Sequence, residues 1–323
     1  MHCSPIPLNG VDFFKPVNSP YRESFQPLDA RFPNIHIGVE VEVEDCPKLS
    51  IYGWKWHDEP SLRSEDNSEY VTFGSILAGH LPAALDELFM AMPPTRSFSD
   101  ACSTHVHVDA RYWSSEQLGC LFAAYYSVEP LLFGFVGNRR RSNNYCVPWY
   151  DALLRAEFIA WERDFANISS GKYAALNFCN LRSRNKGTVE FRHWPGLADR
   201  PRFETWVLLI TRLCNYASKT RYNVHVERMR QLKTMTNTSE YLTCIFGEVS
   251  EALPHDHEAV QRAVKTYLSA EVSVKPIIAC VPNSPLAKRL NTTKGPKIRK
   301  RKSPAVAENL AVPAPNEFQE RGR

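Results

Sequence analysis

The chain has 323 residues, 43% of them hydrophobic and 11% aromatic, which is the composition of a folded globular protein large enough to bury a sizeable core. It contains neither a run of 18 apolar residues nor a secretion signal, and its nine scattered cysteines include no C-x-x-C pair, so we expect a cytoplasmic protein without membrane segments, disulfide framework or zinc ribbon. The formal net charge of +4 arises at the C-terminal end, because residues 283–323 carry 10 Lys and Arg against 3 Asp and Glu.

Segments of alternating polar and apolar residues predict short strands along the first two thirds of the chain. In chain order these strands are expected at residues 35–44, 52–57, 69–74, 103–110, 173–178 and 187–194. Helical spacing is found at 75–91, 114–134, 149–165 and 202–219, with two or three more amphipathic helices from 222 to about 270. We therefore predict an α+β fold, with an antiparallel sheet covered by helices on one face. A single domain is expected over residues 31–275, between an N-terminal extension, 1–30, and a disordered tail, 283–323.

The first predicted strand, IHIGVEVEVED at residues 35–45, places its carboxylates on one face. Because successive side chains alternate across a strand, Glu40, Glu42 and Glu44 share the face opposite three valines. Like charges on one face lie roughly 7 Å apart and repel each other, and a bound cation removes that repulsion. The pattern favours a metal site over an ordinary solvated face, with Glu44 expected only at its rim.

Two later strands also gather polar residues on one face. His105, His107 and Asp109 share a face in STHVHVDA, and Glu190 and Arg192 share a face in GTVEFRHW. Carboxylates from several strands, together with imidazole groups, would form an oxygen-rich site suited to Mg²⁺ or Mn²⁺. For any one strand taken alone, a solvated face is the alternative.

Other motifs compete with this interpretation. HVHVDA resembles the His-x-His-x-Asp-His pattern of metallo-β-lactamase-like hydrolases, but Ala110 stands where the last histidine is expected, and no H-E-x-x-H occurs. Neither a P-loop nor a G-x-G-x-x-G sequence is present, so a nucleotide would need another kind of site. A zinc-dependent hydrolase and a catalytically degenerate binding module remain open as alternatives.

Six motifs follow one another between residues 31 and 220 in an order that resembles a known family. They are GVEVEVE, WHDEPSLRSEDNSEYVT, STHVHVD, NRRRSNNYCVP, KYAALNF and GTVEFRHWPG. The sequence resembles the putative amidoligases of the carboxylate-amine ligase superfamily, which includes glutamine synthetase and glutamate–cysteine ligase. The resemblance implies a curved antiparallel sheet of the glutamine synthetase kind that holds ATP and divalent metal ions. It also implies an ATP- and Mg²⁺-dependent ligase that phosphorylates a carboxylate and lets an amine displace the phosphate, which forms an amide.

The resemblance assigns roles to individual residues. It implies five metal ligands, which are Glu40, Glu42, Glu69, Glu190 and His107. Arg192 lies two residues after Glu190 on the same strand, and its guanidinium would contact the phosphoryl group during transfer. Arg192, Glu190 and His107 are therefore the expected catalytic residues, with His105 close to the metal.

The resemblance also implies contacts with nucleotide and substrate. Arg141, Lys172 and Asn177 are expected to bind the cofactor, and for Lys172 and Asn177 a structural role is equally open. Asp58 in WHDEPS is a further acidic candidate, with a turn as its alternative role. The substrates are small-molecule or peptide carboxylates and amines that the sequence does not distinguish.

The C-terminal tail is rich in Pro, Ala and Lys, lacks apolar periodicity and contains the run KIRKRK. These features predict disorder. Such a run can contact a polyanion such as nucleic acid through its phosphates, and the plain alternative is a solubilising tail. In a eukaryote the same run would be a nuclear localisation signal.

Overall fold

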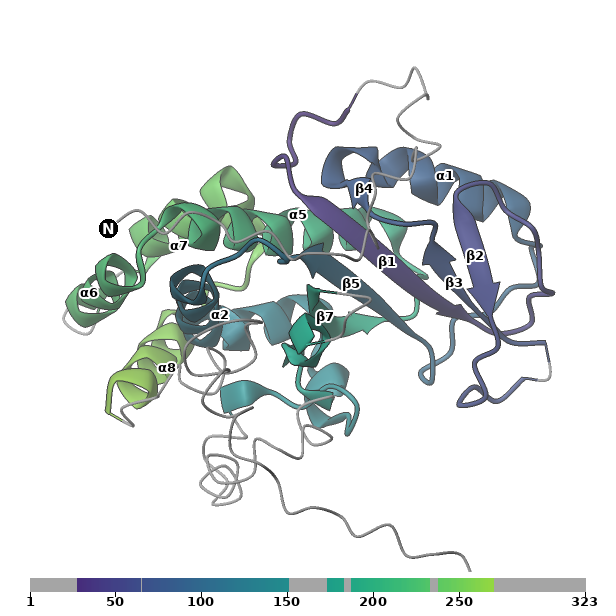
Figure 1. Ribbon diagram of the computed structural model, residues 1–323. Coiled ribbons are helices and arrows are strands. Elements are labelled where there is room, and N and C mark those ends of the chain that lie inside the picture. Colours follow the sequence, from purple (N-terminus) through teal and green to yellow (C-terminus); the bar gives the residue numbers. More distant parts are fainter. Residues whose placement is uncertain (1–27, 65, 151–172, 183–186, 233–237, 270–323) are drawn as a thin grey trace, which may run out of the picture.

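The computed structural model describes residues 28–64, 66–150, 173–182, 187–232 and 238–269. In these residues an antiparallel sheet lies beside a group of helices, with further helices across one face of the sheet (Figure 1). Most of the expected N-terminal extension, most of the helix expected at 149–165 and the whole basic tail lie outside the described residues.

Strands and helices follow one another along the chain as a mixed series. The strands are β1 His36–Val43, β2 Trp54–His57, β3 Ser68–Thr72, β4 Ile76–Leu77, β5 Ser103–Asp109, β6 Leu176–Asn177 and β7 Thr188–Pro195. The α-helices are α1 Leu81–Ala91, α2 Ser115–Val136, α5 Arg200–Lys219, α6 Tyr222–Leu232, α7 Ser239–Phe246 and α8 His257–Ser269. Short 3-10 helices are η2 Ala78–His80, η3 Asn138–Ser142, η5 Cys179–Arg182 and η6 Gly247–Ala252.

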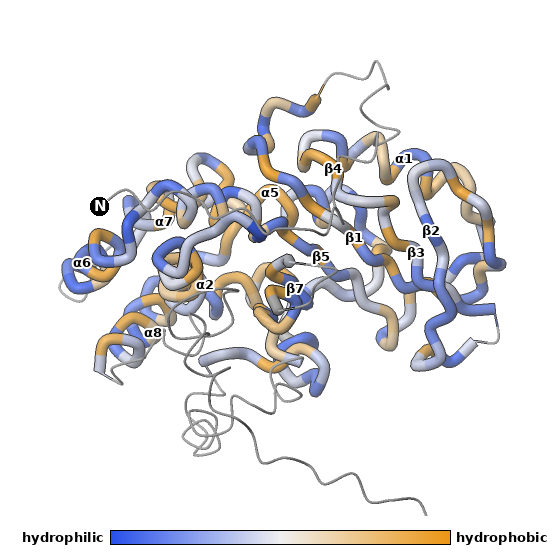
Figure 2. Tube along the Cα trace, in the orientation of Figure 1, coloured by the Kyte–Doolittle hydropathy of each residue, from blue (hydrophilic) through white to orange (hydrophobic). Residues whose placement is uncertain are grey.

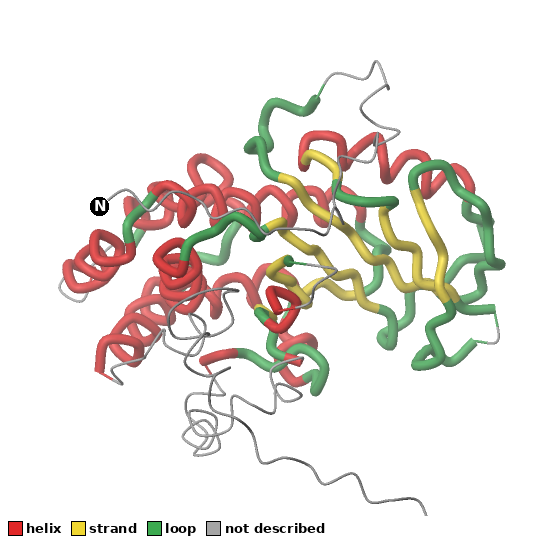
Figure 3. The backbone as a smooth tube through the Cα atoms, in the orientation of Figure 1, coloured by secondary structure: helices red, strands yellow, loops and turns green. Residues whose placement is uncertain are grey.

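The strands form one sheet in the order β2-β3-β1-β5-β7-β6, with β4 also paired to β1. Every strand pair is antiparallel, and the sheet does not close on itself. Figure 3 shows the strands in yellow as a layer separate from most of the red helices. The predicted mixed fold with an antiparallel sheet is therefore confirmed.

The apolar face of the sheet packs against helices. Val39, Val41 and Val43 of β1 have no exposed surface, and burying each valine contributes roughly 1.5–3 kcal/mol. The indole Nε1 of Trp54 in β2 donates a hydrogen bond to the carbonyl oxygen of Ala84 in α1 at 3.0 Å. Helices α1 and α5 both lie beside the sheet (Figure 1).

A β-bulge interrupts the pairing of β5 with β7. Thr104 lies opposite Trp194 whereas Val106 lies opposite Phe191, so β7 has one residue more than β5 across this stretch. After the bulge, His193 and Trp194 both face the helices, and the His193 ring lies 5.0 Å from the ring of Trp206 in α5. Arg192, two residues after Glu190, stays on the opposite face, and the bulge turns Trp194 away from that face.

Helix α2 forms the centre of the helical layer. Its N-terminus has the expected capping box, in which Ser114 and Gln117 exchange side-chain and backbone hydrogen bonds. The helix is long and apolar enough to cross a membrane, but 89% of its most apolar stretch is buried inside the protein, as in a core helix. By contrast, Figure 2 shows orange and blue segments alternating along α8, which buries one side only.

The helix expected over residues 75–91 is shorter in the structure and begins at Leu81. Ile76 and Leu77 form β4 instead, because they pair with the beginning of β1. Pro82 lies in the first turn of α1, where its missing N–H leaves no helical hydrogen bond unmade. The prediction was therefore wrong for residues 75–77, whereas Ala78–His80 form the 3-10 helix η2 that leads into α1.

Two buried histidines make the fold sensitive to acid. Burial lowers the pKa of His193 and of His225 to about 3, against 6.5 for an exposed histidine. Between these pH values the unfolded chain binds a proton that the folded chain excludes, so the free energy of unfolding falls as pH decreases below 6.5. Urea unfolding from pH 7 to pH 4.5 should show for His225→Gln a pH slope smaller by about one proton. The exposed His255→Gln control should keep the wild-type slope, and an unchanged slope in His225→Gln would contradict the assignment.

Candidate functional site

A cleft of about 910 Å³ opens on the polar face of the sheet. Its lining includes six carboxylates, which belong to Glu40, Glu42, Glu59, Glu69, Asp100 and Glu190. Three guanidinium groups also line it, from Arg63, Arg140 and Arg192. The acidic excess is concentrated where β1, β3, β5 and β7 lie side by side, so the cleft is suited to a cation.

The register of three strands places acidic and imidazole side chains next to one another. Glu40 of β1 lies opposite His105 of β5, and His107 of β5 lies opposite Glu190 of β7. His107 Nε2 is 3.1 Å from Glu40 Oε1, while His105 Nδ1 is 3.3 Å from Glu40 Oε2 and 3.6 Å from Glu190 Oε1. The structure thus brings together residues that are 150 positions apart in the sequence.

Three groups of side chains offer donor atoms that all lie within 4.8 Å of one another. The groups are Glu40 with His107 and Glu190, Glu40 with Glu69 and His105, and Glu42 with Glu59 and Glu69. Two groups combine two carboxylates with one imidazole and the third has three carboxylates, and such oxygen-rich donor sets suit Mg²⁺ or Mn²⁺. All five side chains predicted to bind metal belong to at least one group, and Glu40 and Glu69 each belong to two.

Electrostatics keep the two central carboxyl groups ionised. Burial opposes ionisation of Glu40, but the adjacent rings of His107 and His105 bring the pKa of its carboxyl well below the usual range. Burial also opposes ionisation of Glu190, and His107, His105 and Arg192 lower the pKa of this carboxyl as well. Both groups are therefore carboxylates near neutral pH, as metal ligands must be.

Two asparagines hold Glu190 in place. The side-chain amides of Asn177 and Asn180 donate hydrogen bonds to Glu190 Oε2 at 2.8 and 2.7 Å. Asn177 was expected to contact the cofactor, and its side chain is 2% exposed in the wall of the cleft, where it orients a carboxylate. The alternating pattern of the strands could not predict Asn180, because this residue follows β6 in a 3-10 helix.

Loss of an amide that orients Glu190 should weaken metal binding. Partners of this kind usually change metal affinity by roughly 10- to 100-fold when removed. We expect Asn180→Ala to weaken Mn²⁺ binding by roughly tenfold, measured by calorimetry on the folded protein. The exposed Asn223→Ala on α6 is the control and should bind as the wild type does. Equal affinities in the two variants would show that Glu190 needs no support from Asn180.

Arg192 lies in the cleft wall beside Glu190. Its Nη1 contacts Glu190 Oε1, and its Nε donates a hydrogen bond to the carbonyl oxygen of Tyr145 at 3.0 Å. Arg140 lies behind it and donates hydrogen bonds to the carbonyl oxygens of His193 and Arg192 at 3.0 and 2.7 Å. The guanidinium of Arg192 is thus held at the cleft by side-chain and backbone contacts.

Several predicted residues lie elsewhere. Arg141 is exposed, and among the described residues Arg140, not Arg141, lines the cleft. Lys172 lies outside the described residues. Asp58 is 70% exposed and forms an ion pair with Lys48. Glu44, expected at the rim, is buried and accepts a hydrogen bond from the backbone N–H of Arg63 at 2.8 Å, so its role is structural.

Two other cleft residues were missed, Glu59 in the loop after β2 and Ser103 at the first position of β5. Glu59 is adjacent to the predicted Asp58 and supplies the carboxylate that groups with Glu42 and Glu69. Ser103 fixes Glu42, since its N–H and hydroxyl donate hydrogen bonds to Glu42 Oε2 at 2.7 and 2.8 Å. The only sequence signal for Glu59 was its place in the acidic motif WHDEPS.

Cys146 is buried in the loop that follows α2 and η3. Burial raises the pKa of its thiol to about 12, so the group stays protonated near neutral pH and is a poor nucleophile. No disulfide joins the cysteines of the described residues. The site therefore relies on carboxylates, imidazoles and guanidinium groups.

A mixed fold with an acidic cleft on an antiparallel sheet describes the class of protein, and a comparison with protein families finds one similarity. A family model described as a putative amidoligase enzyme matches residues 84–214, from α1 to α5. The match confirms the resemblance to the putative amidoligase family over these residues, and it indicates an enzyme of the ligase type. It includes the site residues of β5 and β7, whereas β1 and β3 precede it. No curated protein matches the chain.

Proposed function

We propose that the protein is an ATP- and Mg²⁺-dependent carboxylate-amine ligase that forms an amide through an acyl phosphate. The proposal rests mainly on one observation, which is that the donor atoms of Glu40, His107 and Glu190 lie within 4.8 Å of one another with Arg192 beside Glu190. The family match supports a ligase, and a cleft of about 910 Å³ has room for a nucleotide and a small acceptor.

The metal ion and the substrates have separate parts in the proposed reaction. A divalent metal ion, Mg²⁺ or Mn²⁺, would neutralise charge on the nucleotide phosphates. A carboxylate oxygen of the acid forms a bond to the γ-phosphorus as the bond to ADP breaks. The amine nitrogen then forms a bond to the acyl carbon, phosphate leaves, and a proton of the amine passes to solvent.

Under this proposal, the side chains of the protein position the ligands and stabilise their charge. Glu40 and Glu190 are ionised and positioned to hold a cation, and His107 is fixed by a contact between its Nδ1 and the hydroxyl of Thr188 at 3.0 Å. Arg192 presents a guanidinium that can bind two phosphoryl oxygens at once. Under this proposal, the side chains supply positioning and electrostatic stabilisation rather than a covalent intermediate.

The alternative zinc hydrolase receives less support from the geometry. In His-x-His-x-Asp sites the aspartate joins the histidines as a ligand, but here both carboxylate oxygens of Asp109 contact the guanidinium of Arg111, at 2.8 and 2.5 Å. The rings of His105 and His107 instead contact the carboxylate of Glu40. A binding module without catalysis remains the other alternative.

The decisive experiment incubates the full chain with ATP, Mg²⁺ and pooled carboxylic acids and amines. We expect mass spectrometry to find ADP, phosphate and a product lighter by one water than its two parents. Release of AMP and pyrophosphate would instead indicate adenylation and would contradict the acyl phosphate. Tight Zn²⁺ binding without nucleotide binding would favour the hydrolase, and binding of neither would favour the binding module.

A further inference from the structure

Three hollows follow one another along β1, from the cleft on its polar face to a pocket between the start of the strand and α5. The large cleft is followed by a middle hollow of about 200 Å³ and by an end pocket of about 620 Å³. Successive residues on this face line them in order: Glu42 the cleft, Glu40 the cleft and middle hollow, Gly38 the middle hollow, and His36 the end pocket. The hollows therefore form a track that follows the strand.

The neighbouring strand β5 repeats this order in the opposite direction. Ser103 and His105 line the cleft, His107 lines the middle hollow, and Asp109 lines both the middle hollow and the end pocket. Because Glu40 and Asp109 each belong to two adjacent hollows, the three hollows adjoin. At roughly 3.3 Å per residue, the track from Glu42 to His36 is roughly 20 Å long, the length of about six residues of extended chain.

Gly38 lines the middle hollow and contributes no side chain to it. A Cβ atom placed there would lie 3.6 Å from Thr72 Oγ1 and 3.7 Å from His107 Cβ, which is ordinary contact. A larger side chain would extend further into this small hollow. Gly38 therefore keeps open the passage between the metal-binding residues and the end pocket.

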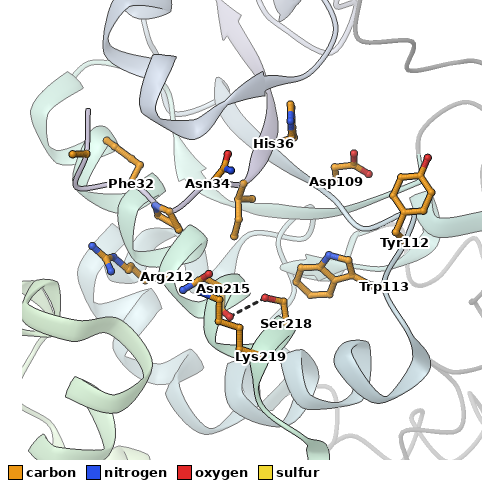
Figure 4. Close-up of a pocket in the computed structure, with 13 residues that line it drawn as sticks. Phe32, Asn34, His36, Asp109, Tyr112, Trp113, Arg212, Asn215, Ser218 and Lys219 are labelled. Carbon is orange, nitrogen blue, oxygen red and sulfur yellow. Dashed lines mark hydrogen bonds between the residues drawn. The ribbon is translucent and has the colours of Figure 1, made fainter. Parts of the chain in front are cut away.

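The end pocket carries an excess of positive charge (Figure 4). Its lining comes from the segment before β1, the turn after β5 and the last turns of α5. Arg212 and Lys219 of α5 contribute two cations. The acid in the lining, Asp109, is already paired with Arg111. An anionic group would therefore find favourable charge here, next to the 69% exposed ring of Tyr112.

We propose that one substrate of the ligase is an extended peptide with an acidic distal end. Its reacting end lies in the cleft near Glu40, its middle passes over Gly38, and its acidic group lies beside Arg212 and Lys219. The reaction itself rests on the proposed function, but the peptide site does not require it. A nucleic-acid strand fits less well, because the carboxylate of Glu40 borders the narrow middle hollow and repels the phosphates of a continuous strand.

The test uses fluorescent heptapeptides of Gly, Ala and Ser that carry two Glu or two Gln residues at one end, in both orientations, and a labelled dipeptide. Fluorescence anisotropy with the full chain should show roughly tenfold tighter binding of one Glu peptide than of its Gln counterpart. Lys219→Glu should remove this preference, whereas the exposed Lys265→Glu on α8 should keep it. Gly38→Val should weaken heptapeptide binding more than dipeptide binding, with Gly38→Ala between Gly38→Val and the wild type.

The outcomes separate the peptide site from the ligase reaction. Equal binding of Glu and Gln peptides, or an unchanged preference in a folded Lys219→Glu variant, would overturn the acidic peptide. Calorimetry with Mg²⁺ and ATP is done on the same samples. Nucleotide binding without peptide binding would overturn the extended substrate and leave the ligase standing. If the peptides bind as expected but the nucleotide does not bind, the result would support the peptide site and contradict the ligase reaction.

Discussion

Replacing Arg192 by alanine should lower turnover by roughly 10²- to 10³-fold, the loss seen when one preorganised donor is removed from a transition state. Charge builds up on the transferred phosphoryl group only during transfer, so the guanidinium should favour the transition state over bound ATP. Nucleotide affinity should therefore change little. Steady-state release of ADP, with ATP affinity measured separately, checks both parts of this prediction.

Matched variants identify the reason for the loss. Arg192→Lys should recover only part of the activity, because an ammonium is a point charge that does not bind two oxygens side by side. Arg230→Ala, on the exposed side of α6, should behave as the wild type. Full turnover in a folded Arg192→Ala variant would make Arg192 a structural ion-pair partner of Glu190. Arg140, which lines the same cleft, would then be the next candidate for the phosphoryl contact.

Glu40→Gln should weaken Mn²⁺ and Mg²⁺·ATP binding together by roughly 100-fold. Glu40 belongs to two of the three groups of potential ligands, so its loss affects more than one metal position. Removal of groups that only orient a ligand already costs roughly 10- to 100-fold in affinity, and loss of the ligand's charge should reach the upper end. Calorimetry with each metal, with and without ATP, measures both affinities.

Glu44→Gln is the matched control for this variant. It changes a buried glutamate of the same segment that contacts a backbone N–H outside the three groups, and glutamine can still accept that hydrogen bond. Metal binding in Glu44→Gln should stay close to the wild type. If Glu40→Gln folds and binds metal with unchanged affinity, the metal site is wrongly assigned.

The alternating pattern predicted much of the sheet and the shared face of its carboxylates. Val39 and Glu40 are neighbours in β1, so strand alternation points Val39 toward the helices and Glu40 toward the cleft. Pairing between distant strands could not be read in the same way. That Glu40 lies opposite His105, and His107 opposite Glu190, depends on strand order and register.

The sequence pattern could not predict deviations from regular strand and helix geometry. Strict alternation from Glu190 would have placed Trp194 in the cleft, but the bulge in β7 turns it toward α5. Likewise, three consecutive arginines gave no means of choosing Arg140 over Arg141, because the choice depends on how a short 3-10 turn packs against β7. Glu59 and Asn180 come from turns, where side-chain direction has no fixed period.

The central place of β1 in the sheet bears on how the protein can be dissected. The segment matched by the family begins after β1 and β3, yet β1 pairs with β5 along most of its length. A fragment of residues 84–214 would leave the hydrogen-bonding groups on one side of β5 open as an edge strand. Such an edge is a template for pairing with other chains, so we expect this fragment to aggregate rather than to serve as a minimal enzyme.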